Sequence, residues 1–319
     1  MLGALLTTVF FFLSSIFANR AIRSVGATRA NLGRLLVAFV CLATWAHLLP
    51  VWFGIGGSGL EGAGRNHFLL SGLIGMGLGD LAVFAALPLL GARLTVVVTQ
   101  CLAAPIAALT EWAWLGTRLN GSQAGWSLLV LAGVALALAP SRRHPPRVQV
   151  RPAGILFGIA AAAGQGIGAA VSRKAYELTA AAGQSIDGLS ATYQRLLGGI
   201  VLTVLFFAAQ RLLRPTAESM PVREEPSPTE PAGGGALRSV FVRWRWTLCN
   251  GLSGPVLGVS CYQWALGTTP SGLVLPIVAT TPIVTLPLAY WIDGERPTLR
   301  SVLGSLIAVG GVVALALAR

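Results

Sequence analysis

Charged residues are scarce in this chain. Only 11% of its 319 residues are Asp, Glu, Lys or Arg, whereas 54% are hydrophobic. A soluble domain carries about 25% charged residues, so the chain lacks the polar surface that a water-soluble fold of this length requires. With a mean hydropathy of +0.72, lipid is the expected solvent. Helices are the expected elements, because open strands leave backbone groups unsatisfied in hydrocarbon.

Negative charge is rarer still, since 11 acidic residues stand against 23 basic ones and give a net charge of +12. The basic residues are nearly all Arg, with Lys174 as the only Lys, and most lie in short loops between apolar runs. This placement is typical of positive charge held at one membrane face, and it argues against nucleic acid as a partner. Counted loop by loop, the basic residues predict that both termini lie outside the cytoplasm.

Cysteine and histidine are also few. The chain has 4 Cys and 3 His, and they are scattered along it without a CxxC pair or a His cluster. No P-loop, HExxH or GxSxG motif occurs. These absences argue against a disulfide framework, a zinc site, ATP-driven pumping and the common hydrolase chemistries. We therefore expect no cofactor, no metal and no enzymatic activity.

Long apolar runs dominate the chain. Ten of them reach the length of about 20 residues that a membrane-spanning helix needs. The first could pass for a signal peptide, but it has no basic start, so we interpret it as an uncleaved span. Residues 214–238 are rich in Pro, Gly, Ser and Glu, which predicts a disordered loop. The predicted spans are residues 2–19, 33–53, 68–90, 93–115, 122–140, 152–171, 191–210, 246–267, 271–292 and 299–318.

The second half of the chain repeats the first. Residues 115–139 read almost like residues 293–317, at a spacing of 178, and residues 71–79 match residues 250–258 at a spacing of 179. Matches in the same order at near-constant spacing indicate an internal duplication. Each copy holds five spans, an odd number, so the second copy must run inverted relative to the first, as in many secondary transporters. The predicted repeats are residues 1–140 and 152–319.

The segment DGERPTLRSVLGSLIAVGGVVALAL, which begins at Asp293 after Pro282, resembles the end of an EamA-type repeat. Such repeats belong to the drug/metabolite transporter superfamily, whose members have ten helices from two repeats, so the resemblance covers essentially the whole chain. The first copy departs from the pattern, because Thr117 stands where the family usually has Glu. The family also places both termini inside, contrary to the charge count.

The resemblance implies a secondary transporter, with export favoured, of small metabolites such as amino acids or related compounds. It further implies alternating access, with coupling to protons or exchange, in a bacterial inner membrane. The expected partners are the small-molecule substrate and membrane lipid, and a homodimer is left open. Two other hypotheses come from different classes: an intramembrane enzyme that modifies lipid, and a membrane scaffold that transports nothing.

Asp80 is the only acid well inside a predicted span, where a carboxyl group normally faces a water-filled cavity, relays protons or pairs with substrate. The alternative is a structural hydrogen bond. Phe84 lies one helical turn further on the same face, and the 179-residue spacing pairs it with Gln263. Tyr262 beside Gln263 favours a binding pocket, or else an interface anchor. The remaining candidates for substrate or proton binding are Gln100 and Gln165.

Three other charged residues are predicted to lie at the membrane interface. Glu111 stands near the end of a span and is followed by Trp112 and Trp114, a pattern typical of the interface, although a proton-linked role is the alternative. Arg34 and Arg195 open equivalent spans, and their long side chains are expected to reach back to the interface.

Overall fold

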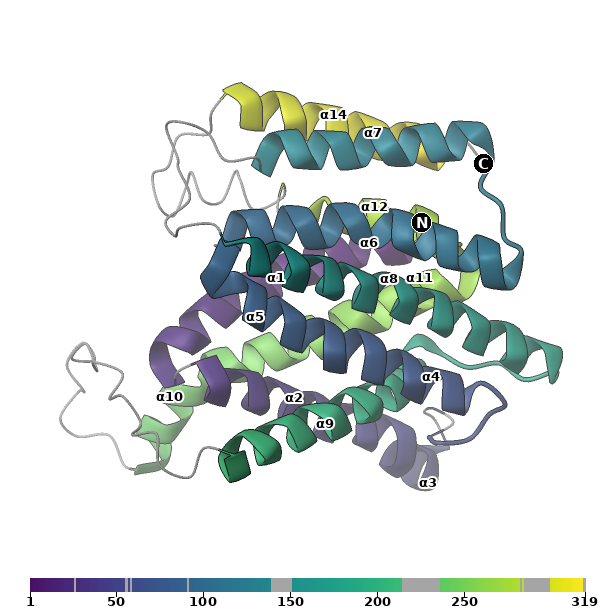
Figure 1. Cartoon of the computed structure of the whole chain (residues 1–319). Coiled ribbons are helices and arrows are strands. Elements are labelled where there is room, and N and C mark those ends of the chain that lie inside the picture. The colour runs from purple at the N-terminus through teal and green to yellow at the C-terminus, as the bar shows by residue number, and fades with distance from the viewer. Residues whose placement is uncertain are drawn as a thin grey trace.

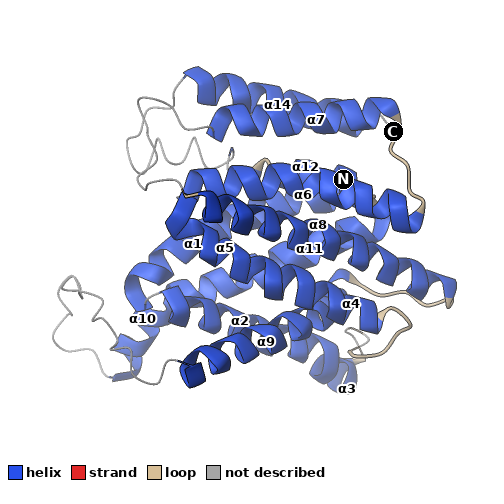
Figure 2. Ribbon diagram, in the orientation of Figure 1, coloured by secondary structure: helices blue, strands red, loops and turns tan. Residues whose placement is uncertain are grey.

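The structure is a computed structural model that describes residues 1–25, 27–54, 57, 59–90, 92–138, 151–213, 236–281, 283 and 299–317. Within these ranges every regular element is a helix and none is a strand (Figure 2), which confirms the expected all-α class. The first half contains α1 (Leu2–Val25), α2 (Ala27–Ala43), η1 (Thr44–Leu48), α3 (Leu49–Phe53), α4 (Arg65–Gly72), η2 (Leu73–Gly79), α5 (Asp80–Leu90), α6 (Ala92–Leu115) and α7 (Gly121–Leu138). The second half contains α8 (Pro152–Ala181), α9 (Gly188–Leu213), α10 (Ala236–Gly251), η3 (Leu252–Gly258), α11 (Val259–Thr268), α12 (Ser271–Val278) and α14 (Leu299–Leu317).

The segments η2 and η3 are π-helical interruptions of two long helices. They begin at Leu73 and Leu252, at the same 179-residue spacing as the sequence match. Inside η3, Pro255 has no N–H to donate to the preceding turn, which accounts for the local departure from the α-helix. η2 has no proline and instead contains three glycines. Segments of this kind occur frequently at functional sites.

The packing of the helices follows the duplication. Helix α1 packs against α10, η3 and α11, and helix α8 packs against α4, η2 and α5. The first helix of each half therefore contacts the interrupted helix of the other half. In the same way α2 packs against α10, and α9 packs against α4 and η2. Helices α7 and α14, which end the two halves, lie side by side (Figure 1).

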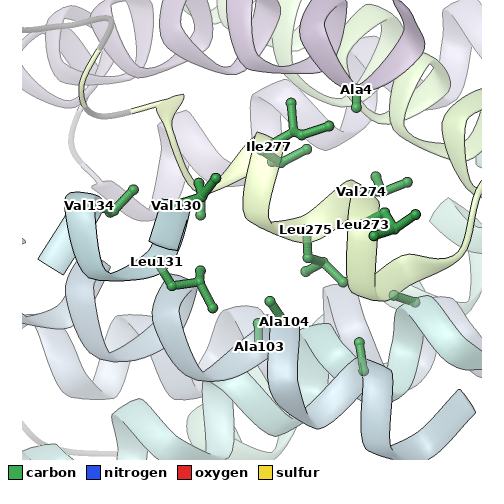
Figure 3. Packing of buried hydrophobic residues seen from close by; sticks show 14 of the residues in the cluster. Ala4, Ala103, Ala104, Val130, Leu131, Val134, Leu273, Val274, Leu275 and Ile277 are labelled. Atoms are coloured by element: carbon green, nitrogen blue, oxygen red, sulfur yellow. The ribbon is translucent and has the colours of Figure 1, made fainter. Parts of the chain in front are cut away.

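The largest buried apolar cluster among the described residues surrounds α12, with side chains from α1, α6 and α7 (Figure 3). Helix α12 contributes Leu273, Val274, Leu275 and Ile277, all of which are buried. The facing residues on α6 are small, so α12 approaches that helix closely. This cluster lies beside the interrupted helices and holds the ends of the two halves together. The residues that α6 and α7 contribute are Ala103, Ala104, Ala107, Val130, Leu131, Val134 and Ala137.

Glycine allows the interrupted helices to approach their neighbours closely. A Cβ built on Gly164 of α8 would lie 2.8 Å from the Cα of Gly79, and one on Gly168 would lie 3.1 Å from the Cα of Gly75. A Cβ on Gly72 would collide with the backbone carbonyl of Arg195. Gly72, Gly75 and Gly79 therefore form a helix-packing face, which brings α8 and α9 against this segment.

Four stretches within the described ranges are long and apolar enough to cross a membrane, and three shorter helices are also apolar. The count of ten spans stays a prediction. Helix α10 begins at Ala236, so the end of the expected loop 214–238 is helical, whereas residues 214–235 lie outside the described ranges. The turn at residues 293–298 lies outside them too. The four long stretches are Arg29–Phe53, Arg65–Val83, Pro152–Ala181 and Gly188–Phe206, and the shorter ones are Leu2–Ala18, Gly121–Ala137 and Val302–Leu315.

Candidate functional site

Asp80 is the first residue of α5, directly after the π-helical segment η2. Its carboxylate Oδ2 lies 3.5 Å from the Nη2 of Arg34 on α2, and 36% of the Asp80 side chain is exposed. Asn31 orients Arg34, because its Oδ1 accepts a hydrogen bond of 2.7 Å from the Arg34 Nε. Helix α2 begins at Ala27, so Arg34 lies two turns inside the helix. Its side chain pairs with Asp80, and the interfacial position of Arg34 stays a prediction.

Arg195 is the second guanidinium of the site and comes from α9. The residue is only 5% exposed, so the expectation that it reaches the interface is wrong. Its Nη1 donates a hydrogen bond of 3.3 Å to the Ser172 hydroxyl on α8, and its Nη2 lies against Gly75 of η2. The Arg195 guanidinium also interacts electrostatically with Asp80. Asp80 therefore contacts one arginine at 3.5 Å and interacts with a second at longer range, and the two arginines occupy equivalent positions in the two halves.

Two tyrosines extend the site toward the second half. The Arg195 guanidinium lies 5.7 Å from the ring centroid of Tyr262, a distance typical of a cation–π contact. Tyr176 on α8 also interacts electrostatically with Arg195, and its buried hydroxyl has no hydrogen-bond partner among the described residues. We call the side chains that surround Asp80 the central polar cluster. Its members are Arg34, Asp80, Ser172, Arg195 and Tyr262.

Gln263 follows Tyr262 on α11 and is 0% exposed. Neither its amide oxygen nor its amide nitrogen has a hydrogen-bond partner among the described residues. A buried amide without partners is costly, and it marks a place where a polar ligand would be stabilised. Phe84, its expected equivalent, lies on α5, but its side chain is outside the described residues.

The other two predicted site residues lie apart from the central polar cluster in the contacts that the structure describes. Gln100 on α6 and Gln165 on α8 are both half-buried, and within the described ranges no hydrogen bond joins either side chain to the central polar cluster. The glycines beside Gln165 explain its position: Gly164 packs against η2 and Gly166 packs against the α6 backbone. Gln165 therefore lies on α8 between two tightly packed contacts.

Glu111 forms a second buried polar group, and its depth at the membrane interface stays a prediction. The residue is 1% exposed, and its two carboxylate oxygens accept the Ser271 backbone N–H at 3.0 and 3.2 Å. Its Oε1 also lies 3.6 Å from the Nε of Arg173, whose Nη1 donates to the carbonyl of Leu266 at 2.7 Å. Glu111 thus satisfies the free N–H at the start of α12 and fixes the α11–α12 turn.

A pocket of about 350 Å³ opens beside that turn. Thr268, Thr269 and Pro270 line it together with residues at the ends of α1, α7 and α14. It lies at one end of the bundle, and none of the central polar cluster lines it. The described residues also hold no group of three His, Cys, Asp or Glu side chains arranged for a metal ion.

Sequence reasoning missed Arg195 and Arg173. Both stand near positively charged or small residues in the sequence, and a basic residue near a helix end is usually at the interface. The missed signal in the case of Arg195 was its position: the helix begins at Gly188, so Arg195 lies two turns inside it. Helix starts are not readable from hydropathy alone when Ser, Thr and Gln fill the first turns.

The apolar helices and the buried charged cluster between them define a polytopic integral membrane protein. The model of the EamA-like transporter family matches residues 152–317, more than half of the chain. The chain therefore belongs to the EamA-like transporter family, within the drug/metabolite transporter superfamily. A solved structure described as "Crystal structure of protein" shares 18% identity with it, with a TM-score of 0.65 over 99% of this chain and 96% of the other. That likeness concerns the fold. None of the curated proteins compared with the chain matches it.

Proposed function

We propose that this protein is a proton-coupled secondary transporter that exports small metabolites such as amino acids or related compounds. The observation that carries the proposal is the position of Asp80 at the junction of η2 and α5, where its carboxylate lies 3.5 Å from the Arg34 guanidinium. Family membership makes it a membrane transporter of small molecules. The site adds an ionisable carboxyl group within the transmembrane region, where charged groups are expensive and commonly functional.

The proposed architecture is ten helices in two inverted five-helix repeats, residues 1–140 and 152–319. Three features support it. The two π-helical segments are 179 residues apart, the first helix of each half packs on the interrupted helix of the other, and the last helices of the halves lie side by side. When two inverted repeats surround one binding site, the protein can open that site to either side of the membrane in turn. This is what alternating access requires.

Two polar contacts fit the same symmetry. Ser14 on α1 donates a hydrogen bond of 2.7 Å to the Oδ1 of Asn250, just before η3. The Ser172 and Ser71 hydroxyls lie 2.7 Å apart, just before η2. Ser71 and Asn250 are equivalent at the 179-residue spacing. In each half, a hydroxyl of the leading helix therefore binds the other half's interrupted helix two residues before its π-helical segment begins.

In the proposed cycle, Asp80 accepts a proton from one side of the membrane and releases it to the other. When Asp80 is ionised, it holds Arg34 and interacts with Arg195. When it is protonated, it no longer balances either arginine, so the contacts among α2, α5 and α9 change. A proton on one carboxyl group thereby shifts the balance between two packings of the bundle, provided the two states bind the proton with different affinity.

The placement in a bacterial inner membrane belongs to this proposal as well. Its tests are direct. The purified protein is reconstituted in sealed vesicles, and efflux of labelled amino acids is measured with and without an imposed pH gradient. The proposal expects transport that the gradient accelerates. A protein that moves no solute but modifies lipid would favour an intramembrane enzyme, and a protein with neither activity would favour a scaffold.

A further inference from the structure

The central polar cluster has more positive than negative charge. Two guanidinium groups, on Arg34 and Arg195, face one carboxylate, on Asp80, which leaves one positive charge. The two arginines are not equally paired. The Arg34 guanidinium lies 3.5 Å from the Asp80 carboxylate and also donates to Asn31. Among the described residues, no carboxylate oxygen lies within 4 Å of the Arg195 guanidinium.

The donors of Arg195 are poorly satisfied for so buried a group. Its hydrogen bond to the Ser172 hydroxyl is long at 3.3 Å, it donates another to the Tyr262 hydroxyl, and its buried Nε has no acceptor among the described residues. A guanidinium carries five N–H donors in a planar fork that matches a carboxylate. Burial of this charge at 5% exposure is costly unless an anion or further acceptors reach it.

The surroundings of Arg195 favour a small organic anion. Tyr262 offers an aromatic face beside the guanidinium at 5.7 Å. Gln263, the next residue on α11, offers a buried amide with both polar atoms unpartnered. Gly75 makes room for the guanidinium itself, because a Cβ on this residue would collide with the Arg195 Nη2. A guanidinium fork beside an aromatic ring suits the recognition of a carboxylate with a short organic body.

We propose that Arg195 binds the carboxylate of the transported metabolite, so that the substrates of this protein are carboxylic acids with one uncompensated negative charge at the binding site. This inference rests on the proposed function, because it names the substrate class of that same site. The carboxylate neutralises the surplus charge of the cluster and supplies acceptors for the guanidinium donors. Arg34 stays with Asp80, so the two arginines have different roles despite their equivalent positions.

The experiment uses the full-length protein in detergent and measures binding, which keeps it separate from transport. The probes are 2-amino and 2-oxo carboxylic acids, each tested beside its own primary amide by thermal shift and by calorimetry. At least one acid should bind, and its amide should bind about 10- to 100-fold more weakly, the range for losing a hydrogen bond to a charged group. This comparison needs no variant, so it remains decisive even if Arg195 variants fold poorly.

Variants then assign the binding to Arg195. Arg195→Gln should weaken the acid by about 10- to 100-fold, and Arg195→Lys should restore part of the affinity because it keeps the charge but loses the fork. Arg245→Gln is the matched control: it removes one positive charge from an exposed position on α10 and should leave the affinity unchanged. Equal binding of acid and amide, undiminished acid binding by Arg195→Gln, or no binding by any acid would overturn the proposal. If acids bind as expected but no vesicle experiment shows their movement, the carboxylate site stands and the transport function fails.

Discussion

Asp80 and Glu111 are two carboxyl groups inside the same helical bundle, and their surroundings differ sharply. Glu111 is almost fully buried, and its oxygens accept the Ser271 N–H and face Arg173. Asp80 keeps 36% of its side chain exposed and has one ion-pair contact at the long distance of 3.5 Å. A second guanidinium, on Arg195, interacts with Asp80 without forming a close pair.

The difference separates an acid that holds the fold from one that is free to change its partners. The contacts of Glu111 are made to a helix start and to a guanidinium that is itself bound to a carbonyl, so its loss would leave several groups unpaired. Asp80 lies at a helix break with surplus positive charge around it. A residue in such a position can gain or lose a proton without breaking the hydrogen bonds of a turn. It can also release an arginine that then binds a substrate.

The largest expected effect tests the structural side of this comparison. Glu111→Ala should cost about 3–5 kcal/mol of stability, because it leaves the buried Arg173 without its carboxylate. Glu111→Gln should cost less, since an amide oxygen can still accept the Ser271 N–H. The measurement is thermal unfolding in detergent, followed by intrinsic Trp fluorescence. Equal stability of Glu111→Ala and the wild type would show that this carboxyl group does not hold the turn.

A second prediction concerns the packing that places η2 beside Arg195. Gly72→Ala should destabilise the protein by about 1–3 kcal/mol, because the added Cβ collides with the Arg195 backbone carbonyl. The matched control is its equivalent in the second half, Gly251→Ala. There the Cβ would lie 3.0 Å from the carbonyl of Arg34 but 2.7 Å from the Val37 Cβ, so a smaller loss is expected. If Gly251→Ala were the more damaging change, the close backbone contact at Gly72 would not be the critical one.

The smallest effect is expected for the exposed ion pair itself. A double-mutant cycle with Arg34→Ala and Asp80→Ala should give a coupling energy in stability of about 0.2–1 kcal/mol, because both side chains are partly exposed at 25% and 36%. The cycle is measured by the same unfolding assay. A coupling above about 3 kcal/mol, the range of buried pairs, would make Asp80 a structural residue like Glu111 and remove the contrast between them.

Much of this fold is readable from the sequence. The apolar runs predicted the helices, and the turn at Thr269–Pro270 separates α11 from α12. The 179-residue match predicted equivalent segments, and the structure places a π-helical interruption in both.

The site was less predictable, because hydropathy shows depth along a span but not which neighbour a side chain meets. Glu111 looked interfacial because Trp112 and Trp114 follow it, and both are indeed exposed. The Glu111 side chain, however, points the other way, toward the start of α12. Arg195 was missed for a related reason: its partners, Ser172 and Tyr262, are on helices that only the tertiary fold brings to it.

The central claim is that Asp80, and not Glu111, carries the coupling proton. The most direct test is substrate movement in proteoliposomes under an imposed pH gradient, with Asp80→Asn compared with Glu111→Gln. Asp80→Asn keeps the shape of the side chain and removes its titration. The account predicts that Asp80→Asn folds and still exchanges substrate, but that the gradient no longer accelerates its transport, whereas Glu111→Gln keeps the gradient response in whatever protein folds. Undiminished gradient-driven transport by Asp80→Asn would contradict it.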